Sequence, residues 1–169
     1  AAVGIQKASL YAHYAGKELI FSAVLEDVVE EYRHTIDELT QRRKNEGALE
    51  QLARIFRAYI QYCHQNIKMY FWDRYFYYPP EFIRERMARV TGETQAEFIR
   101  AIERTVSEGI ETGEIRRQPV SGAALAYYYL MIGLAMSVQL YERDALERDI
   151  ALAWQSLSLG LRNEETTGE

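Results

Sequence analysis

Apolar residues recur every three or four positions along most of this 169-residue chain, which is the spacing of one buried face of an α-helix. The first run spans 17–44, and Asn45 and Gly47 after it predict its end. Its predicted inward positions are Ile20, Phe21, Val24, Leu25, Val28, Val29, Tyr32, Ile36 and Leu39. Strand-like alternation is absent, so the pattern predicts an all-α fold.

The rest of the chain divides into further helices with recognisable end signals. Predicted ranges are 48–65, 66–78, 81–112, 119–141 and 144–161. Asn66 is placed to cap the short aromatic helix, which closes before Pro79. Gly92 marks a possible interruption of the 81–112 helix, and Asp144 is a candidate cap for the last one.

The stretch 119–141 contains no charged residue and is long enough to cross a membrane. It nevertheless carries three consecutive tyrosines, two serines and Gln139, whereas the other helices have strong polar faces. A helix buried on all sides in a helical assembly explains this composition better. We therefore expect no membrane association.

The first residues carry a different kind of signal. Gly4 supplies a turn residue that tolerates positive φ, and 6–14 fits a short helix with Leu10 inward. No acidic residue occurs before Glu18, so nothing in this stretch repels phosphate. This is the composition expected of a turn and recognition helix, followed at once by a long helix.

Residues 3–21 resemble the DNA-binding signature of the TetR family of bacterial repressors. The positions that carry the resemblance are Gly4, Lys7, Ser9, Leu10, Tyr11, His13, Tyr14, Lys17, Glu18 and Phe21. The resemblance implies a helix-turn-helix followed by a helical bundle that binds a small molecule and forms a homodimer. The stretch 108–116, with its Gly…Gly-Glu pattern, also looks like that family.

The resemblance implies which side chains meet double-stranded operator DNA. Lys7 and Ser9 can reach base edges in a major groove, and the methyl groups of Ala8 and Ala12 can contact thymine. Phosphate contacts are expected from Tyr11, His13 and Lys17. The complete candidate set is Gln6, Lys7, Ala8, Ser9, Tyr11, Ala12, His13 and Lys17.

A helix-turn-helix needs earlier helices than this sequence provides. We interpret 1–16 as part of a DNA-binding domain truncated within its motif, 17–162 as a ligand-binding and dimerisation domain, and 163–169 as a tail. The expectation is that the parent protein binds DNA and that this chain does not.

Seven aromatic residues within 69–78 predict a helix that buries nearly all its sides, against protein, a ligand or both. Plain core packing is an equally good reading of this run. The functional reading is a pocket for an aromatic or lipophilic inducer, in which Asp73 or Glu85 would select a cation. Candidate lining residues are Phe56, Tyr59, Cys63, Tyr70, Phe76, Met87, Phe98, Tyr128 and Met131.

Small residues form a stripe on the uncharged helix, where another helix can approach closely. With the last helix, this predicts a four-helix interface in a twofold dimer, although the stripe could also pack within one chain. The predicted interface residues are Gly122, Ala126, Gly133, Ser137, Ile150, Ala153, Leu157 and Leu161.

Composition narrows the classes of function that remain open. The net charge of −5 confines any basic DNA surface to the first seventeen residues, and the single cysteine suits the cytoplasm. Glu31 and His34 have a di-iron spacing, but the motif occurs once, so His34 is expected on the surface. Cys63 and His64 point apart, and no metal site, cofactor or catalytic set is expected. The alternative to a ligand-responsive repressor is a helical small-molecule carrier without a DNA role.

Overall fold

The structure, a computed structural model, describes residues 16–137 and 143–163. Within these residues it contains six α-helices, a short 3-10 helix and no strand, which confirms the all-α class. The elements are α2 (Lys17–Thr40), α3 (Ala48–Gln65), α4 (Ile67–Tyr77), η1 (Glu81–Ile83), α5 (Arg84–Glu111), α6 (Val120–Ser137) and α7 (Arg143–Leu161). The candidate recognition helix and most of the predicted tail lie outside the described residues.

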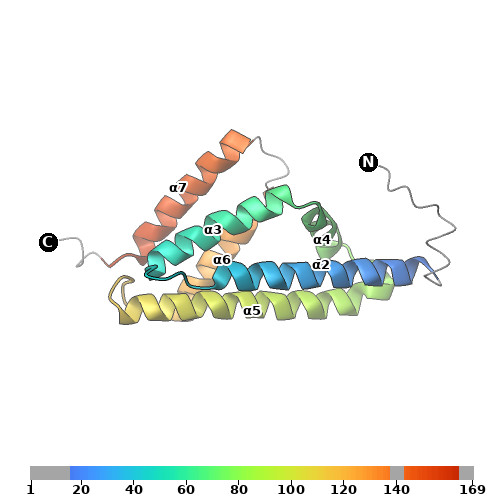
Figure 1. The fold of residues 1–169 in the computed structure, drawn as a ribbon, viewed down its shortest axis with the longest axis horizontal. Coiled ribbons are helices and arrows are strands. Elements are labelled where there is room, and N and C mark those ends of the chain that lie inside the picture. Colours follow the sequence, from blue (N-terminus) through green and yellow to red (C-terminus); the bar gives the residue numbers. More distant parts are fainter. Residues whose placement is uncertain (1–15, 138–142, 164–169) are drawn as a thin grey trace.

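Two long helices, α2 and α5, lie side by side and run in the same direction along the molecule (Figure 1). Ion pairs join them in matching order along both helices. Arg33 Nη2 lies 3.2 Å from Glu93 Oε2, and Arg42 Nη1 lies 2.7 Å from Glu108 Oε2. The shorter helices α3, α4 and α6 pack against this pair, and α7 packs on α3 and α6.

One hydrophobic core connects all six helices. Leu25, Phe56, Phe98, Met131 and Ile150 come from five of them, and each is at most 1% exposed. These residues occupy the inward positions that three- and four-residue spacing favours. The core explains why the apolar periodicity is so regular along the chain.

The first long helix ends earlier than the sequence predicts. α2 stops at Thr40 rather than near Lys44, and Asn45 lies in the following connection with φ 62°. Side chains of α3 donate hydrogen bonds to the last carbonyls of α2. Gln51 Nε2 donates to Thr40 O at 2.9 Å, and Arg54 Nη1 donates to Leu39 O at 2.7 Å. These hydrogen bonds satisfy carbonyl oxygens that have no partner within the helix, so α2 ends where α3 packs against it.

Other predicted helix ends had mixed outcomes. The side chain of Asn66 accepts a hydrogen bond from Lys68 N at 2.8 Å, so the predicted cap of α4 is confirmed. α5 continues through Gly92 without interruption. Asp144 does not precede α7 but lies in its first turn, where an acidic residue still complements the helix dipole.

The Gly…Gly-Glu stretch forms the corner after α5. Gly113 has φ +79°, a conformation that suits a residue without a side chain. The carboxylate of Glu114 then accepts a hydrogen bond from Leu49 N at 3.0 Å, at the open amino end of α3. Ile115 is buried, and its backbone pairs with Arg162 just after α7. The pattern therefore has a structural role in joining three helices.

Candidate functional site

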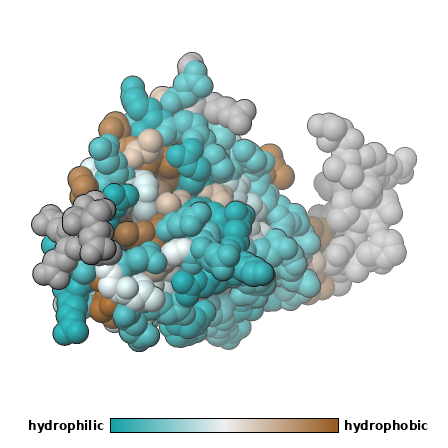
Figure 2. Space-filling model, turned by 60° about the vertical axis from the view of Figure 1, so that its left-hand side comes forward, coloured by the Kyte–Doolittle hydropathy of each residue, from teal (hydrophilic) through white to brown (hydrophobic). Residues whose placement is uncertain are grey.

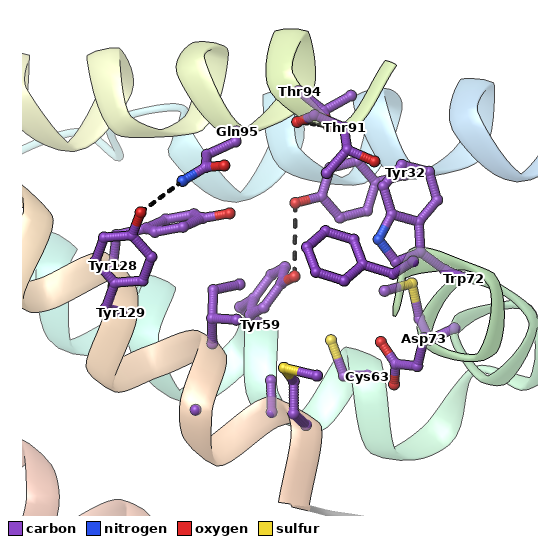
Figure 3. Close-up of a pocket in the computed structure, with 16 residues that line it drawn as sticks. Tyr32, Tyr59, Cys63, Trp72, Asp73, Thr91, Thr94, Gln95, Tyr128 and Tyr129 are labelled. Carbon is purple, nitrogen blue, oxygen red and sulfur yellow. Dashed lines mark hydrogen bonds between the residues drawn. The ribbon is translucent and has the colours of Figure 1, made fainter. Parts of the chain in front are cut away.

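The candidate functional site is a cavity of about 320 Å³ between five helices (Figure 3). This volume falls within the range of small-molecule pockets. The lining residues are Tyr32 of α2; Tyr59 and Cys63 of α3; Met69, Trp72, Asp73 and Phe76 of α4; Thr91, Thr94 and Gln95 of α5; and Tyr128, Tyr129, Ile132, Gly133, Ala135 and Met136 of α6. Exposed members of the lining, such as Phe76, Tyr129 and Gly133, mark where it opens to solvent.

Aromatic rings form much of the wall. Tyr32 and Trp72 stack with ring centroids 5.4 Å apart and an interplanar angle of 6°. Tyr59 and Tyr128 both contact the buried ring of Phe98, which lies behind them. Such a wall favours a ligand with flat or apolar groups.

Neutral polar groups are distributed around the cavity. The hydroxyl oxygens of Tyr32 and Tyr59 lie 3.5 Å apart, and Gln95 Nε2 donates to the Tyr129 hydroxyl at 3.1 Å. Burial raises the pKa of Tyr128 to about 12 and the pKa of the Cys63 thiol to about 12 as well. Both groups are therefore uncharged at neutral pH, and the Cys63 thiol is a poor nucleophile there.

Among the described residues of the lining, Asp73 is the one that carries a formal charge. Burial raises its pKa from 3.8 to about 6, because desolvation disfavours the carboxylate. Figure 3 shows Asp73 at the same end of the pocket as Cys63 and Trp72, whereas Gln95 and Tyr129 lie at the other end. The cavity thus has an acidic end and a neutral end.

The structure brings four of the nine sequence-predicted ligand residues to this cavity: Tyr59, Cys63, Phe76 and Tyr128. Phe56, Met87, Phe98 and Met131 are instead fully packed in the core, and Tyr70 of α4 is 40% exposed and absent from the lining. All nine satisfied the same criterion of composition and inward spacing. Which of them face a void depends on how the helices are rotated against one another.

Sequence reasoning missed most of the remaining lining. Tyr32 was assigned to the core of the long helix, yet that helix forms a wall of the cavity. Trp72 and Met69 lie in the aromatic run that drew attention to this region, as does Asp73, which was named only as a possible cation partner. No signal in the sequence marked Thr91, Thr94 or Gln95, because polar residues on a helix normally face solvent.

The predicted small-residue stripe of α6 lies on the surface of the described chain. Gly122, Ala126 and Gly133 are exposed and Ser137 is half-buried, while large apolar side chains beside them, Leu125 and Leu130, are also exposed. Gly133 has a second role that the sequence did not predict, because it lines the cavity. Within the described residues, Gly122, Ala126 and Gly133 are not covered by another helix.

The predicted interface residues of α7 require correction. Ile150 and Leu161 are 1% and 3% exposed and belong to the core, so they cannot form the surface of a dimer. Ala153 and Leu157 are half-buried and pack against the same core. The large apolar side chains that α7 does expose are Leu152 and Leu159.

Apolar surface is visible on the outside of the molecule. Figure 2 shows brown patches that interrupt a largely teal face. Among the described residues, Val120–Ser137 is long and apolar enough to cross a membrane by length and composition, and 33% of it is buried. Its inward residues include Tyr127, whose hydroxyl donates to Leu52 O at 2.7 Å within the core. Within the described chain, α6 therefore has a buried inner face and an exposed outer face.

The predicted DNA-binding residues Gln6 to His13 lie outside the described residues, so of this predicted set only Lys17 can be placed. Lys17 is exposed in the first turn of α2. His34 is also exposed, and its Nδ1 lies 3.6 Å from Glu38 Oε2 one turn along the same helix. In the described part of the chain, no group of three or more His, Cys, Asp or Glu residues is arranged to hold a metal ion.

No protein-family model matches the chain, and no curated protein matches it significantly. The likeness to the TetR family therefore rests on the sequence pattern at 3–21, with the helical fold and the cavity beside it.

Proposed function

We propose that this chain belongs to a ligand-responsive, DNA-binding transcriptional regulator of the TetR type. A small molecule in the cavity would release the protein from its operator. The observation that carries the proposal is the position of the cavity, because α2 lines it and also continues directly from the DNA-binding pattern at 3–17. Ligand binding and DNA reading would then share one helix.

Contacts of α4 support a physical link between the cavity and the first turns of α2. One side of α4 lines the cavity through Trp72 and Phe76. Its other aromatic side chains, Phe71 and Tyr75, contact the ring of Phe21 in the second turn of α2, with centroids 5.1 and 4.7 Å apart. A ligand that displaces α4 therefore changes the support of the first turns of α2. The ligand shifts the equilibrium between two arrangements of the helices to the extent that it binds one of them more tightly than the other.

A homodimer is part of this proposal. The exposed apolar side chains of α6 and α7, together with the small-residue stripe, form a surface suited to a second copy. A dimer would present two DNA-reading heads to a palindromic site. Binding of ligand would then alter the spacing of the heads.

The test is DNA selection with the protein expressed from the whole reading frame. We expect enrichment of a short, roughly palindromic duplex with half-sites about one helical turn apart or more. Lys17→Ala should weaken binding similarly on every duplex, and Lys7→Ala should change which duplex is preferred. Lys44→Ala, a matched change at an exposed lysine beyond α2, should leave binding unchanged.

Absence of any preference over random duplex would reject the regulator. Such a result would favour the rival function, a helical carrier of small molecules, because the cavity serves either role. Equal losses on all duplexes for both lysine variants would contradict the separate roles of Lys7 and Lys17.

A further inference from the structure

We propose that the cavity binds a neutral aromatic carbonyl compound, whose carbonyl oxygen accepts hydrogen bonds from the clustered hydroxyls of Tyr32, Tyr59 and Tyr128. The inference names the chemical class of the ligand. Its regulatory meaning rests on the proposed function, since the cavity is the site assigned there to the small molecule.

The three phenols come from three different helices and meet in one part of the cavity. Tyr32 lies on α2, Tyr59 on α3 and Tyr128 on α6, and all three line the cavity. Figure 3 shows their hydroxyls directed toward one another across the space between these helices. The hydroxyl oxygens of Tyr32 and Tyr59 lie 3.5 Å apart. A ligand oxygen between these hydroxyls would therefore bond to several helices at once.

Within the described residues, the partners of the Tyr32 and Tyr59 hydroxyls are weak. Their separation of 3.5 Å is longer than the about 2.5–3.0 Å of an ordinary hydrogen bond between two oxygens. Tyr59 also bonds to the thiol of Cys63, and sulfur is a weak acceptor. A carbonyl oxygen has two lone pairs and can accept from both hydroxyls in place of these contacts. Because a buried phenol gains most from a good acceptor, the pair favours a carbonyl compound over a hydrocarbon.

All three phenols keep their protons at neutral pH and therefore act as donors. Burial raises the pKa of Tyr128 to about 12, and it raises the pKa values of Tyr32 and Tyr59 above their ordinary value of 10. Tyr128 contributes to both of the latter pKa shifts, so its hydroxyl lies within electrostatic range of theirs. The cluster thus offers hydrogen bonds without a positive charge. It suits a neutral acceptor better than an anion, because an anion loses far more hydration free energy on burial than a carbonyl group does.

Aromatic side chains beside the hydroxyls suit a ring attached to the carbonyl group. The ring of Tyr32 stacks on Trp72, and Phe98 lies behind Tyr59 and Tyr128. The cavity of about 320 Å³ has room for a small ring system. An aryl ketone keeps its ring and its carbonyl group nearly in one plane. Its ring would therefore lie along the aromatic wall while its oxygen meets the hydroxyls.

The experiment compares three ligands of nearly the same shape that differ in one group. They are 2-acetonaphthone, the alkene 2-isopropenylnaphthalene, in which a methylene replaces the carbonyl oxygen, and the anion 2-naphthoate. Affinities for the 169-residue chain are measured by equilibrium dialysis at pH 7.5. For the two neutral ligands, each affinity is divided by the partition coefficient from water into cyclohexane, which removes the difference in hydration. On this scale we expect the ketone to exceed the alkene by about tenfold or more, and the uncorrected affinity of the anion to be below that of the ketone.

Two isosteric variants assign the preference to the tyrosine hydroxyls. Tyr32→Phe and Tyr59→Phe should each lower the affinity for the ketone by about tenfold without lowering the affinity for the alkene. Tyr62→Phe removes a phenol hydroxyl from the same helix as Tyr59 but outside the cavity lining, so it should change neither affinity. The ratio of the two affinities is compared between variants, so a general change in packing cancels.

Either of two results overturns the inference. One is a ketone that does not exceed the alkene on the corrected scale, and the other is no measurable binding of the ketone. Tighter binding of 2-naphthoate than of the ketone would also reject it, in favour of an anionic ligand. Unchanged affinity for the ketone in both Tyr32→Phe and Tyr59→Phe would reject the hydroxyls as the binding groups. DNA selection by the whole protein does not depend on these results, so the regulator stands or falls separately.

Discussion

At the scale of single residues, the side chain of Arg54 makes four hydrogen bonds at the connection between α2 and α3. Its guanidinium donates to Glu46 Oε1 at 2.6 Å and Oε2 at 2.8 Å, and to the carbonyls of Leu39 and Gln41. Both side chains of the pair are largely buried. The hydrogen bonds from Arg54 lower the pKa of Glu46 to about 2. One side chain thus closes the carboxyl end of α2 and orders the turn to α3.

We predict that Arg54→Ala lowers the free energy of unfolding by about 3 kcal/mol, because it removes the charged partner of the buried Glu46 carboxylate, which keeps only the bond from Arg43 N, and leaves the part-buried carbonyl of Leu39 without its donor. Arg57→Ala is the matched control, since Arg57 pairs with Glu147 in an exposed position. That change should cost at most about 1 kcal/mol in urea titrations. Similar losses in the two variants would contradict the assigned role of Arg54.

The depressed pKa of Glu46 gives this prediction a pH dependence. The unfolded carboxyl has an ordinary pKa of 4.5, so the stabilisation is fully present above that pH and is lost as pH falls toward 2. The difference in stability between the unmodified chain and Arg54→Ala should therefore shrink over that window. Chemical denaturation at a series of pH values measures it.

At the scale of elements, two glycines of α5 are predicted to respond oppositely to the same substitution. A Cβ on Gly109 would lie 2.5 Å from Ile115 Cδ1 and 2.8 Å from Ala48 Cβ, whereas one on Gly92 would meet nothing within 4 Å. Gly109→Ala should destabilise by about 1–3 kcal/mol through overpacking. Gly92→Ala should stabilise by about 0.5–1 kcal/mol, because alanine favours the helix. Thermal unfolding of the two variants checks both signs, and a gain for Gly109→Ala would contradict the close packing of this corner.

At the scale of the whole molecule, the proposed dimer predicts which surface changes alter association. Leu152→Arg combined with Leu159→Arg places two charges on the exposed face of α7 and should shift the chain toward monomer in sedimentation velocity. Ile67→Arg, a similar change at an 80% exposed position of α4, should leave association unchanged. Gly133 is a poor site for this test, because a larger residue there would also enter the cavity. A monomeric unmodified chain would reject the dimer.

The sequence by itself determined the helices, because spacing, caps and breakers act within a few residues. The range 48–65 matches α3, and Asn66 and Pro79 bracket α4 as predicted. The predicted length of α2 was wrong because a segment outside that helix contacts its end. α2 ends early because α3 supplies hydrogen bonds to its last turn, and no local signal encodes that meeting.

Only the tertiary structure decided which inward-facing residues line a cavity and which fill the core. Phe56 and Tyr59 lie three positions apart on one helix face, yet the first packs against Tyr127 and Trp154 while the second faces the void. Helical spacing defines a buried face, but the rotation and distance of the neighbouring helices decide what each residue on that face meets. The same reason explains why Ile150, apolar like Leu152, is core and not interface.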